Sequence, residues 1–357
     1  MCPPETSMSL PDPAPVLDLI ESSRRSKTMF AAVAMGVFDR LESSPATVEK
    51  LAADLSAEAE LLERLLDGCV GLGLLRKQGA LYSNERAAST YLCAGSERAL
   101  VGYILYSNEI LFKLWSHLED ALRQGGHRWK PEFGSDAGIF DHFFRSDDAM
   151  RNFLQGMHGL GMLSLPKVVT AFDLSRFHWL VDLGGATGHL AIAACERHPG
   201  LRATVFDLPR VAEIARDRIQ RSAQVSSRID FVAGDFFLDE LPHADLFALG
   251  QIVHDWSETK VRALLGKIYK SLPESGGLLI VEKLLAENRA GPVSTLMQSL
   301  NMLLCTEGKE RSLSEYRFLL EASGFGDVRG VVTERRLTRW KGNRLPGGCG
   351  ISVIFCT

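Results

Sequence analysis

The chain has 357 residues, of which 46% are hydrophobic and 24% charged, and its formal net charge is −4. This length predicts two folded units, and the composition argues against long disordered stretches. The mild acidity gives no reason to expect nucleic acid or an anionic membrane as a partner, and no apolar run approaches the ~18 residues of a membrane span.

The cysteines and the N-terminal residues indicate a compartment. The first fifteen residues carry prolines and acids in place of a basic and then apolar signal peptide. The seven cysteines are scattered, without a CxxC pair or a histidine at metal-ligand spacing. We therefore expect a cytoplasmic protein with reduced thiols and no bound metal.

The N-terminal region reads as helices followed by a hairpin. Apolar residues at three- and four-residue spacing predict one long helix over 16–43, or two joined near Ser26, and further helices over 48–55 and 58–75. A hairpin over 74–84 follows, and the set outlines a winged-helix unit. A winged-helix unit could also bind DNA, but residues 1–90 hold nine Lys/Arg against thirteen Asp/Glu. Such a surface repels phosphates, so a dimerisation module is favoured.

Beyond residue 91 the pattern stays helical, with breaks at Gly125–Gly126 and Gly134, and it changes near residue 176. Short apolar runs then alternate with helical stretches; the runs are HWLVDL, ATVFDL, IDFVA, LFALG and LLIVEK. Strands that alternate with helices indicate a parallel sheet with crossover helices, hence a Rossmann-like α/β domain.

The expected organisation therefore has three parts. A winged-helix-like, α-helical dimerisation domain covers residues 15–105, and linking helices that contribute to a substrate pocket cover 106–172. The α/β domain covers 173–357, with a mostly parallel sheet and an antiparallel last strand formed by ISVIFCT.

A glycine-rich turn follows the first strand, in VDLGGATGHL. Gly184, Gly185 and Gly188 permit a tight turn against which a ligand can lie. No Lys-Ser/Thr pair follows, so the turn is not a P-loop, and it lacks the order of a dinucleotide motif. Asp207 ends the second strand, where a carboxylate accepts hydrogen bonds from ribose hydroxyls. This spacing fits NAD or S-adenosylmethionine, and a helix cap before Pro209 is the structural alternative.

A second acidic residue distinguishes the two cofactors. Asp235 follows the third strand, in AGDFF, and can accept from an adenine amino group, while Phe236 can stack on the ring. An NAD enzyme has no particular need of this acid, so S-adenosylmethionine is favoured. The alternative for Asp235 is a simple turn residue after Gly234.

His254 directly follows the fourth strand, at the same carboxyl edge as the acids. An imidazole there can act as a general base toward a hydroxyl. A base needs an orienting partner on its other nitrogen, and Glu282 and Glu310 are both candidates. Asp255 is a candidate for a more remote acceptor, and Trp256 is expected to pack.

These segments, taken in order, resemble a known family. VDLGGATG, VFDLP, GDFF, HDW, the glutamate of the fifth strand and NMLLCTEGKERS resemble the small-molecule O-methyltransferases of plants and animals. Within that family, MQSLNMLLCTEGKERSLSEY and TAFDLSRF are most similar to the acetylserotonin O-methyltransferase group. The resemblance runs from about residue 15 to 330.

The resemblance implies a metal-independent methyl transfer from S-adenosylmethionine to an aromatic small molecule such as a hydroxyindole or phenol. It also implies a homodimer. It assigns the cofactor to Gly184, Asp207, Asp235 and Phe236, and it makes His254 the base, flanked by Glu282 and Glu310. It places Asn301 against the acceptor molecule, and Phe153 and Met157 along its pocket; for these two residues ordinary core packing is the alternative.

Three features depart from the family pattern. Ala186 occupies a common glycine position, and Gln251 stands where relatives often place an arginine, or a lysine one position earlier, beside the cofactor. Gln251 is therefore a candidate for a cofactor contact that is weaker or replaced. The segment over 333–357 is basic and glycine-rich before its final strand, as an insertion or an altered reading frame would make it. Two rival functions remain at this stage, namely other chemistry such as C-methylation on the same cofactor, and a catalytically silent binding protein.

Overall fold

The computed structural model describes residues 10–134, 139–333 and 351–357. The chain divides into two compact units, one up to Asn108 and the other from Glu109. The unusual segment that precedes the final strand, over 334–350, lies outside the described residues. No helix among the described residues is both long and apolar enough to cross a membrane.

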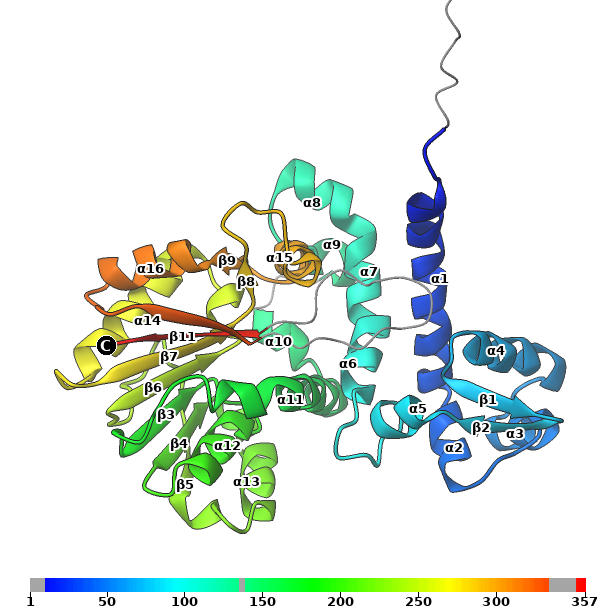
Figure 1. Ribbon diagram of the computed structural model, residues 1–357, viewed down its shortest axis with the longest axis horizontal. Coiled ribbons are helices and arrows are strands. Elements are labelled where there is room, and N and C mark those ends of the chain that lie inside the picture. Colours follow the sequence, from blue (N-terminus) through cyan, green and yellow to red (C-terminus); the bar gives the residue numbers. More distant parts are fainter. Residues whose placement is uncertain (1–9, 135–138, 334–350) are drawn as a thin grey trace, which may run out of the picture. The chain divides into compact units, whose positions relative to one another are not determined.

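The first unit consists of one long helix, several short helices and one hairpin (Figure 1). Its elements are α1 (Ala14–Ala34), α2 (Val37–Ser43), α3 (Val48–Leu55), α4 (Ala59–Gly71), β1 (Leu75–Gln78), β2 (Leu81–Asn84), α5 (Arg86–Tyr91) and α6 (Val101–Tyr106). Phe38, Leu66 and Tyr82 lie at the centre of its apolar core. The predicted helices and hairpin are therefore present.

Neither alternative for residues 16–43 is correct, because α1 runs unbroken past Ser26 to Ala34 and a second helix begins at Val37. Ser22 and Ser23 donate their hydroxyls to the carbonyls of Leu19 and Ile20, so these serines are accommodated within the helix. The chain turns instead at Gly36, whose φ of 76° lies in the left-handed region.

The second unit begins with a helical stretch. Its elements are η1 (Ser107–Leu111), α7 (Phe112–Leu114), η2 (Trp115–His117), α8 (Leu118–Gln124), α9 (Trp129–Phe133), α10 (Ile139–Phe143) and α11 (Asp147–Val168). The predicted breaks are confirmed, since α8 ends before Gly125 and Gly134 caps α9 with a φ of 73°.

The second unit also contains a seven-stranded sheet, whose strands lie in the order β10-β11-β7-β6-β3-β4-β5. Its strands are β3 (Trp179–Leu183), β4 (Arg202–Asp207), β5 (Ile229–Ala233), β6 (Leu246–Gly250), β7 (Gly277–Glu282), β10 (Arg329–Thr333) and β11 (Ile351–Cys356). The first five are parallel to one another, while β11 runs antiparallel to both β7 and β10. The five predicted parallel strands and the antiparallel last strand are confirmed.

Helices cover both faces of this sheet (Figure 1). The remaining elements are α12 (His189–Arg197), η3 (Pro209–Val211), α13 (Ala212–Arg221), η4 (Ser226–Arg228), η5 (Val253–Asp255), α14 (Glu258–Ser271), β8 (Leu284–Leu285), α15 (Val293–Cys305), β9 (Arg311–Ser312) and α16 (Leu313–Ala322). One core joins α11, α12 and α13 to the sheet, and the other joins α14 and α16 to it. The loops at the carboxyl ends of the strands thus emerge at one edge, where α/β sheets bind ligands.

Candidate active site

The turn between β3 and α12 is built on left-handed backbone. Gly184 has a φ of 67° and Gly188 a φ of 74°, and Ala186 adopts a φ of 49° between them. A Cβ on Gly184 would lie 2.5 Å from the side chain of Ile252, so a larger residue here would require Ile252 to move. Ala186 occupies a conformation that costs roughly 1–2 kcal/mol for residues other than glycine. The tight turn predicted from the glycines is therefore present.

Asp207, at the end of β4, holds this turn. Its Oδ2 accepts a hydrogen bond from the amide of Ala186 at 2.8 Å, and its Oδ1 accepts one from Leu208 at 2.7 Å. Burial raises the pKa of Asp207 to about 6, although these two amides act to lower it. A carboxylate offers about four lone-pair positions. Asp207 thus keeps acceptor capacity for further donors, such as a pair of hydroxyls.

Asp235 and Phe236 follow β5, at the same edge. The Oδ1 of Asp235 accepts from the amide of Phe237 at 2.8 Å, which is the turn arrangement raised as its alternative role. The ring of Phe236 lies over the glycine turn, since a Cβ on Gly184 would be 3.5 Å from it. The structure therefore brings Gly184 and Phe236 together, with Asp235 adjacent.

The side chain of Gln251 forms hydrogen bonds within the protein. Its Nε2 donates to Glu282 at 3.0 Å and to the carbonyl of Val281 at 3.3 Å. Its φ of 57° is left-handed, and its own amide also bonds to Val281, at 2.9 Å. Where relatives often place an arginine, Gln251 therefore braces the carboxylate at the end of β7.

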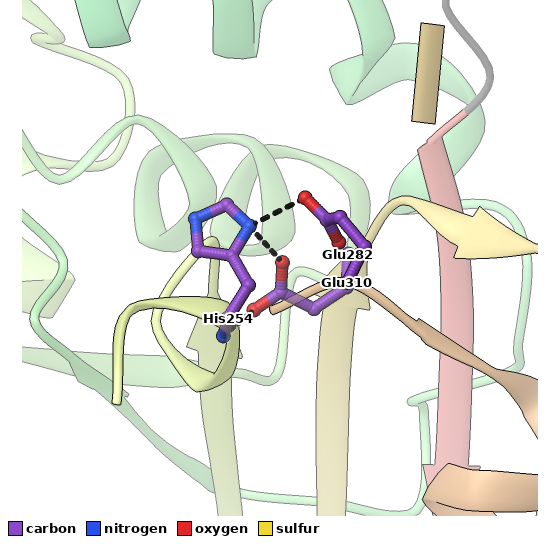
Figure 2. A group of neighbouring side chains, drawn as sticks. All are labelled: His254, Glu282 and Glu310. Carbon is purple, nitrogen blue, oxygen red and sulfur yellow. Dashed lines mark hydrogen bonds and ion pairs between the residues drawn. The ribbon is translucent and has the colours of Figure 1, made fainter. Parts of the chain in front are cut away.

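His254 lies in η5, directly after β6, and is 5% exposed. Its Nδ1 donates to Oε1 of Glu310 at 2.9 Å and lies 3.1 Å from Oε2 of Glu282 (Figure 2). Both predicted candidates therefore flank the same ring nitrogen. The other nitrogen, Nε2, faces away from these two acids and lies 3.6 Å from Asp255.

Glu282 organises the backbone of the loop as well as the ring. Its Oε1 accepts from the amides of Ile252 and Val253 at 3.0 and 2.8 Å, and more weakly from that of His254 at 3.4 Å. The side chain is fully buried. Glu282 therefore fixes the loop that carries His254, while Glu310 makes the closer contact with the ring.

The charges of this cluster are strongly coupled. Burial alone would lower the pKa of His254, but the negative charges of Glu282, Glu310 and Asp255 outweigh burial and raise this pKa to about 10. Burial raises the pKa of Glu282 above its usual range, against the attraction of the imidazolium. At neutral pH His254 is therefore protonated in the resting site.

Two residues that the sequence analysis missed hold Glu310 in place. A Cβ on Gly308 would lie 2.1 Å from the carbonyl oxygen of His254, so only glycine lets this loop pack there. Arg311 is 1% exposed and donates to the carbonyl of Val253 at 3.2 Å. Their positions within GKERS were the available signal, but no local pattern indicated the surface against which they pack.

His254, Glu282 and Glu310 are also the one group among the described residues with metal-ligand geometry, their ligand atoms lying within 4.8 Å of one another. The 2.9 Å contact between Nδ1 and Glu310 is an ordinary length for a charge-assisted hydrogen bond. A proton shared between Nδ1 of His254 and Glu310 therefore accounts for the close approach of these side chains.

The residues expected to contact the acceptor molecule lie on two helices. Asn301, on α15, is 9% exposed and accepts a hydrogen bond from the indole of Trp115 at 2.9 Å. Phe153, on α11, stacks on Phe143 with ring centroids 4.5 Å apart. Met157 lies one turn further along α11 and is half-buried. Phe153 thus belongs to an aromatic cluster. Ordinary core packing, the alternative role of this residue, predicts the same.

Comparison with known proteins gives consistent matches for both units. Residues 115–326 match the O-methyltransferase domain, and residues 17–94 match the O-methyltransferase dimerisation domain. Acetylserotonin O-methyltransferase of Gallus gallus is 42% identical over 310 residues, which cover 85% of this chain and 89% of the relative. The human enzyme of the same name is 39% identical over 309 residues, covering 85% and 89%.

A solved structure agrees over the whole length. The crystal structure of human N-acetylserotonin methyltransferase in complex with SAM has a TM-score of 0.86 and 35% sequence identity, covering 98% of this chain and 99% of that chain.

Proposed function

The chain belongs to the O-methyltransferase family, and from this premise we propose that it methylates a hydroxyl of an aromatic small molecule, using S-adenosylmethionine. His254 is the general base of the reaction. The observation that carries this proposal is the pairing of Nδ1 with two buried carboxylates, which leaves Nε2 for the acceptor.

The residues at the sheet edge suit S-adenosylmethionine chemically. Asp207 has acceptor capacity for ribose hydroxyls, and the turn at Gly184 leaves backbone against which a ligand can lie. Phe236 offers a ring face for adenine, and Asp235 offers its second carboxylate oxygen for the adenine amino group. When bound, the cofactor supplies an electrophilic methyl group on a cationic sulfur.

His254 removes the hydroxyl proton as the oxygen attacks. A phenol has a pKa near ~10, so an ordinary imidazole with a pKa of ~6.5 would accept its proton at a cost of roughly 5 kcal/mol. The raised pKa of His254, about 10, nearly balances this transfer. The free-energy cost then lies in an earlier step, the deprotonation of His254, because only roughly one molecule in a thousand has neutral His254 at pH 7.

The test of the base is His254→Ala. Loss of a general base costs typically 10²–10⁴ in rate. We expect turnover to fall by at least 10³ while the Kd for S-adenosylmethionine, measured by calorimetry, changes less than about threefold. Methyl transfer at more than a tenth of the original rate would remove His254 from this role.

The acceptor molecule that we propose is a hydroxyindole of the N-acetylserotonin type. Support comes from the relatives named above, at 39% and 42% identity over most of their length. Mass spectrometry of the product from N-acetylserotonin should show one added methyl group, on oxygen. A methyl group found on carbon would favour the alternative chemistry, and absence of cofactor binding would favour a silent binding protein.

We also propose that the protein is a cytoplasmic homodimer. The dimerisation domain supports self-association. The first turns of α1 also carry apolar side chains that are more than half exposed in this unit, namely Val16, Leu17, Leu19 and Ile20. The five cysteines among the described residues are buried thiols, as suits a reducing compartment.

A further inference from the structure

The amide of Asn301 is held by residues distant in sequence. The indole Nε1 of Trp115 donates to its Oδ1 at 2.9 Å, across 186 positions of the chain. The thiol of Cys305, one turn further along α15, lies 3.7 Å from the same oxygen. Two donors thus converge on Oδ1.

This arrangement allows one orientation of the amide. An indole N–H can only donate, so it requires the oxygen of Asn301 and excludes the nitrogen. Rotating the amide by 180° would place two donors against each other. The Nδ2 group has no acceptor among the described residues, yet it is absent from the fully buried, unpaired atoms, so it keeps accessible surface. Asn301 therefore presents N–H alone.

This end of α15 is also fixed next to the base. The amide of Arg128 donates to the carbonyl of Leu304 at 2.9 Å, and the indole of Trp129 donates to that of Cys305 at 2.7 Å. Two residues beyond α15, the amide of Glu307 bonds to the carbonyl of Asp255 at 3.1 Å. The amide of Asn301 is thus presented from a rigid helix end that continues into the loop packed on the base.

We propose that Trp115 is a positioning residue that fixes Asn301 as a hydrogen-bond donor toward the acceptor molecule. This inference rests on the proposed function, in which Asn301 contacts that molecule. It follows that the molecule must offer an oxygen that accepts a hydrogen bond at this point, such as a carbonyl, ether or phenol oxygen. An ammonium or amide N–H at the same point meets a donor and is rejected.

A double-mutant cycle tests the proposal in the full-length enzyme, with N-acetylserotonin as acceptor. Trp115→Phe keeps an aromatic ring and removes the donor, so we expect the KM for the acceptor to rise about tenfold, as for loss of one hydrogen bond. The Kd for S-adenosylmethionine should not change. In an Asn301→Leu background, Trp115→Phe should add less than twofold.

An equal tenfold effect of Trp115→Phe in both backgrounds would overturn the proposal, since Trp115 would then act on its own as an apolar wall. The matched control is Trp179→Phe, which removes an indole bond to Thr204 at 3.0 Å at the start of β3. This control should leave the KM unchanged.

A second readout does not depend on turnover. The indole ¹H–¹⁵N resonance of Trp115 should shift upfield in Asn301→Leu and stay near its original position in Asn301→Asp, because a carboxylate also accepts. An unshifted resonance in Asn301→Leu would contradict the bond. A wild-type protein that does not methylate N-acetylserotonin would contradict the proposed acceptor, and the resonance would still decide the role of Trp115.

Discussion

At the scale of single residues, the chemistry depends on which nitrogen of His254 is occupied. Glu310 and Glu282 both face Nδ1, so they set the orientation of the ring and its charge together. Substituting Glu282 removes a different set of contacts from substituting Glu310, so the contributions of the two residues can be separated. Glu282 also anchors three backbone amides of the loop, whereas Glu310 has one hydrogen bond, to the ring.

The pH dependence of kcat/KM should reflect this charge. As the proposed base, His254 must lose its proton before it can act, and its pKa is raised to about 10, so kcat/KM should increase with pH from 7 toward 10. Glu310→Gln removes one negative charge while keeping an acceptor for Nδ1. The midpoint of the pH profile should therefore move to lower pH, by about one unit or more.

The control for this measurement is Glu307→Gln, which neutralises a nearby acid that pairs at the surface with Lys260. Its pH profile should match that of the wild type. A Glu310→Gln profile with an unmoved midpoint would show that another group governs the titration.

At the scale of elements, the glycine turn is tied to α11 by two half-buried histidines. His158 on α11 bonds through Nδ1 to the hydroxyl of Thr187 at 2.9 Å, and this hydroxyl lies 3.2 Å from Nδ1 of His189. Burial lowers the pKa of His158 to about 4 and that of His189 to about 3. Both rings are therefore neutral in the folded protein near pH 6.

This linkage predicts acid sensitivity. In the unfolded chain both histidines bind protons below about pH 6.5, whereas the folded chain resists protonation down to about pH 4, so the contribution of these two histidines to the free energy of unfolding should fall as pH falls through this window. His158→Gln can still bond to Thr187 but does not titrate. Urea unfolding between pH 4 and 7 should show that the free energy of unfolding of the wild type, relative to that of His158→Gln, falls as pH falls, and a difference that stays constant with pH would remove His158 from the explanation.

At the scale of the whole molecule, much of the arrangement was predictable from sequence. Asp207, Asp235 and His254 each follow an apolar run, and parallel strands end at one edge, so their convergence follows from topology. The break near Ser26 was predicted wrongly, because the side chains of the neighbouring serines bond within the helix.

Contacts between distant segments were not predictable. The sequence left Glu282 and Glu310 as alternatives because the choice depends on how the loop at Gly308 packs against His254. The bond between Trp115 and Asn301 spans 186 positions and has no local pattern. Periodicity locates elements, but it does not determine which side chains face each other across a packed interior.

Self-association should depend on the exposed apolar start of α1. Leu17 and Ile20 are 56% and 54% exposed in this unit. The double variant Leu17→Asp, Ile20→Asp places charge on this surface, so we expect a monomer in light scattering coupled to gel filtration. Leu122→Asp, at a position 63% exposed in the second unit, should leave the mass unchanged. A double variant with the mass of the wild type would place the dimer interface elsewhere.

The order of strands in the sheet has a consequence for biosynthesis. The strand β11 lies between β7 and β10, although it follows both of them in sequence, and β10 pairs with β11 alone. During translation β10 therefore leaves the ribosome with no neighbour, and the edge of β7 stays open until residues 351–356 have emerged. Until then the open edge of β7 is available to other chains, so a ribosome that stalls between residues 334 and 350 would leave a nascent chain prone to aggregation.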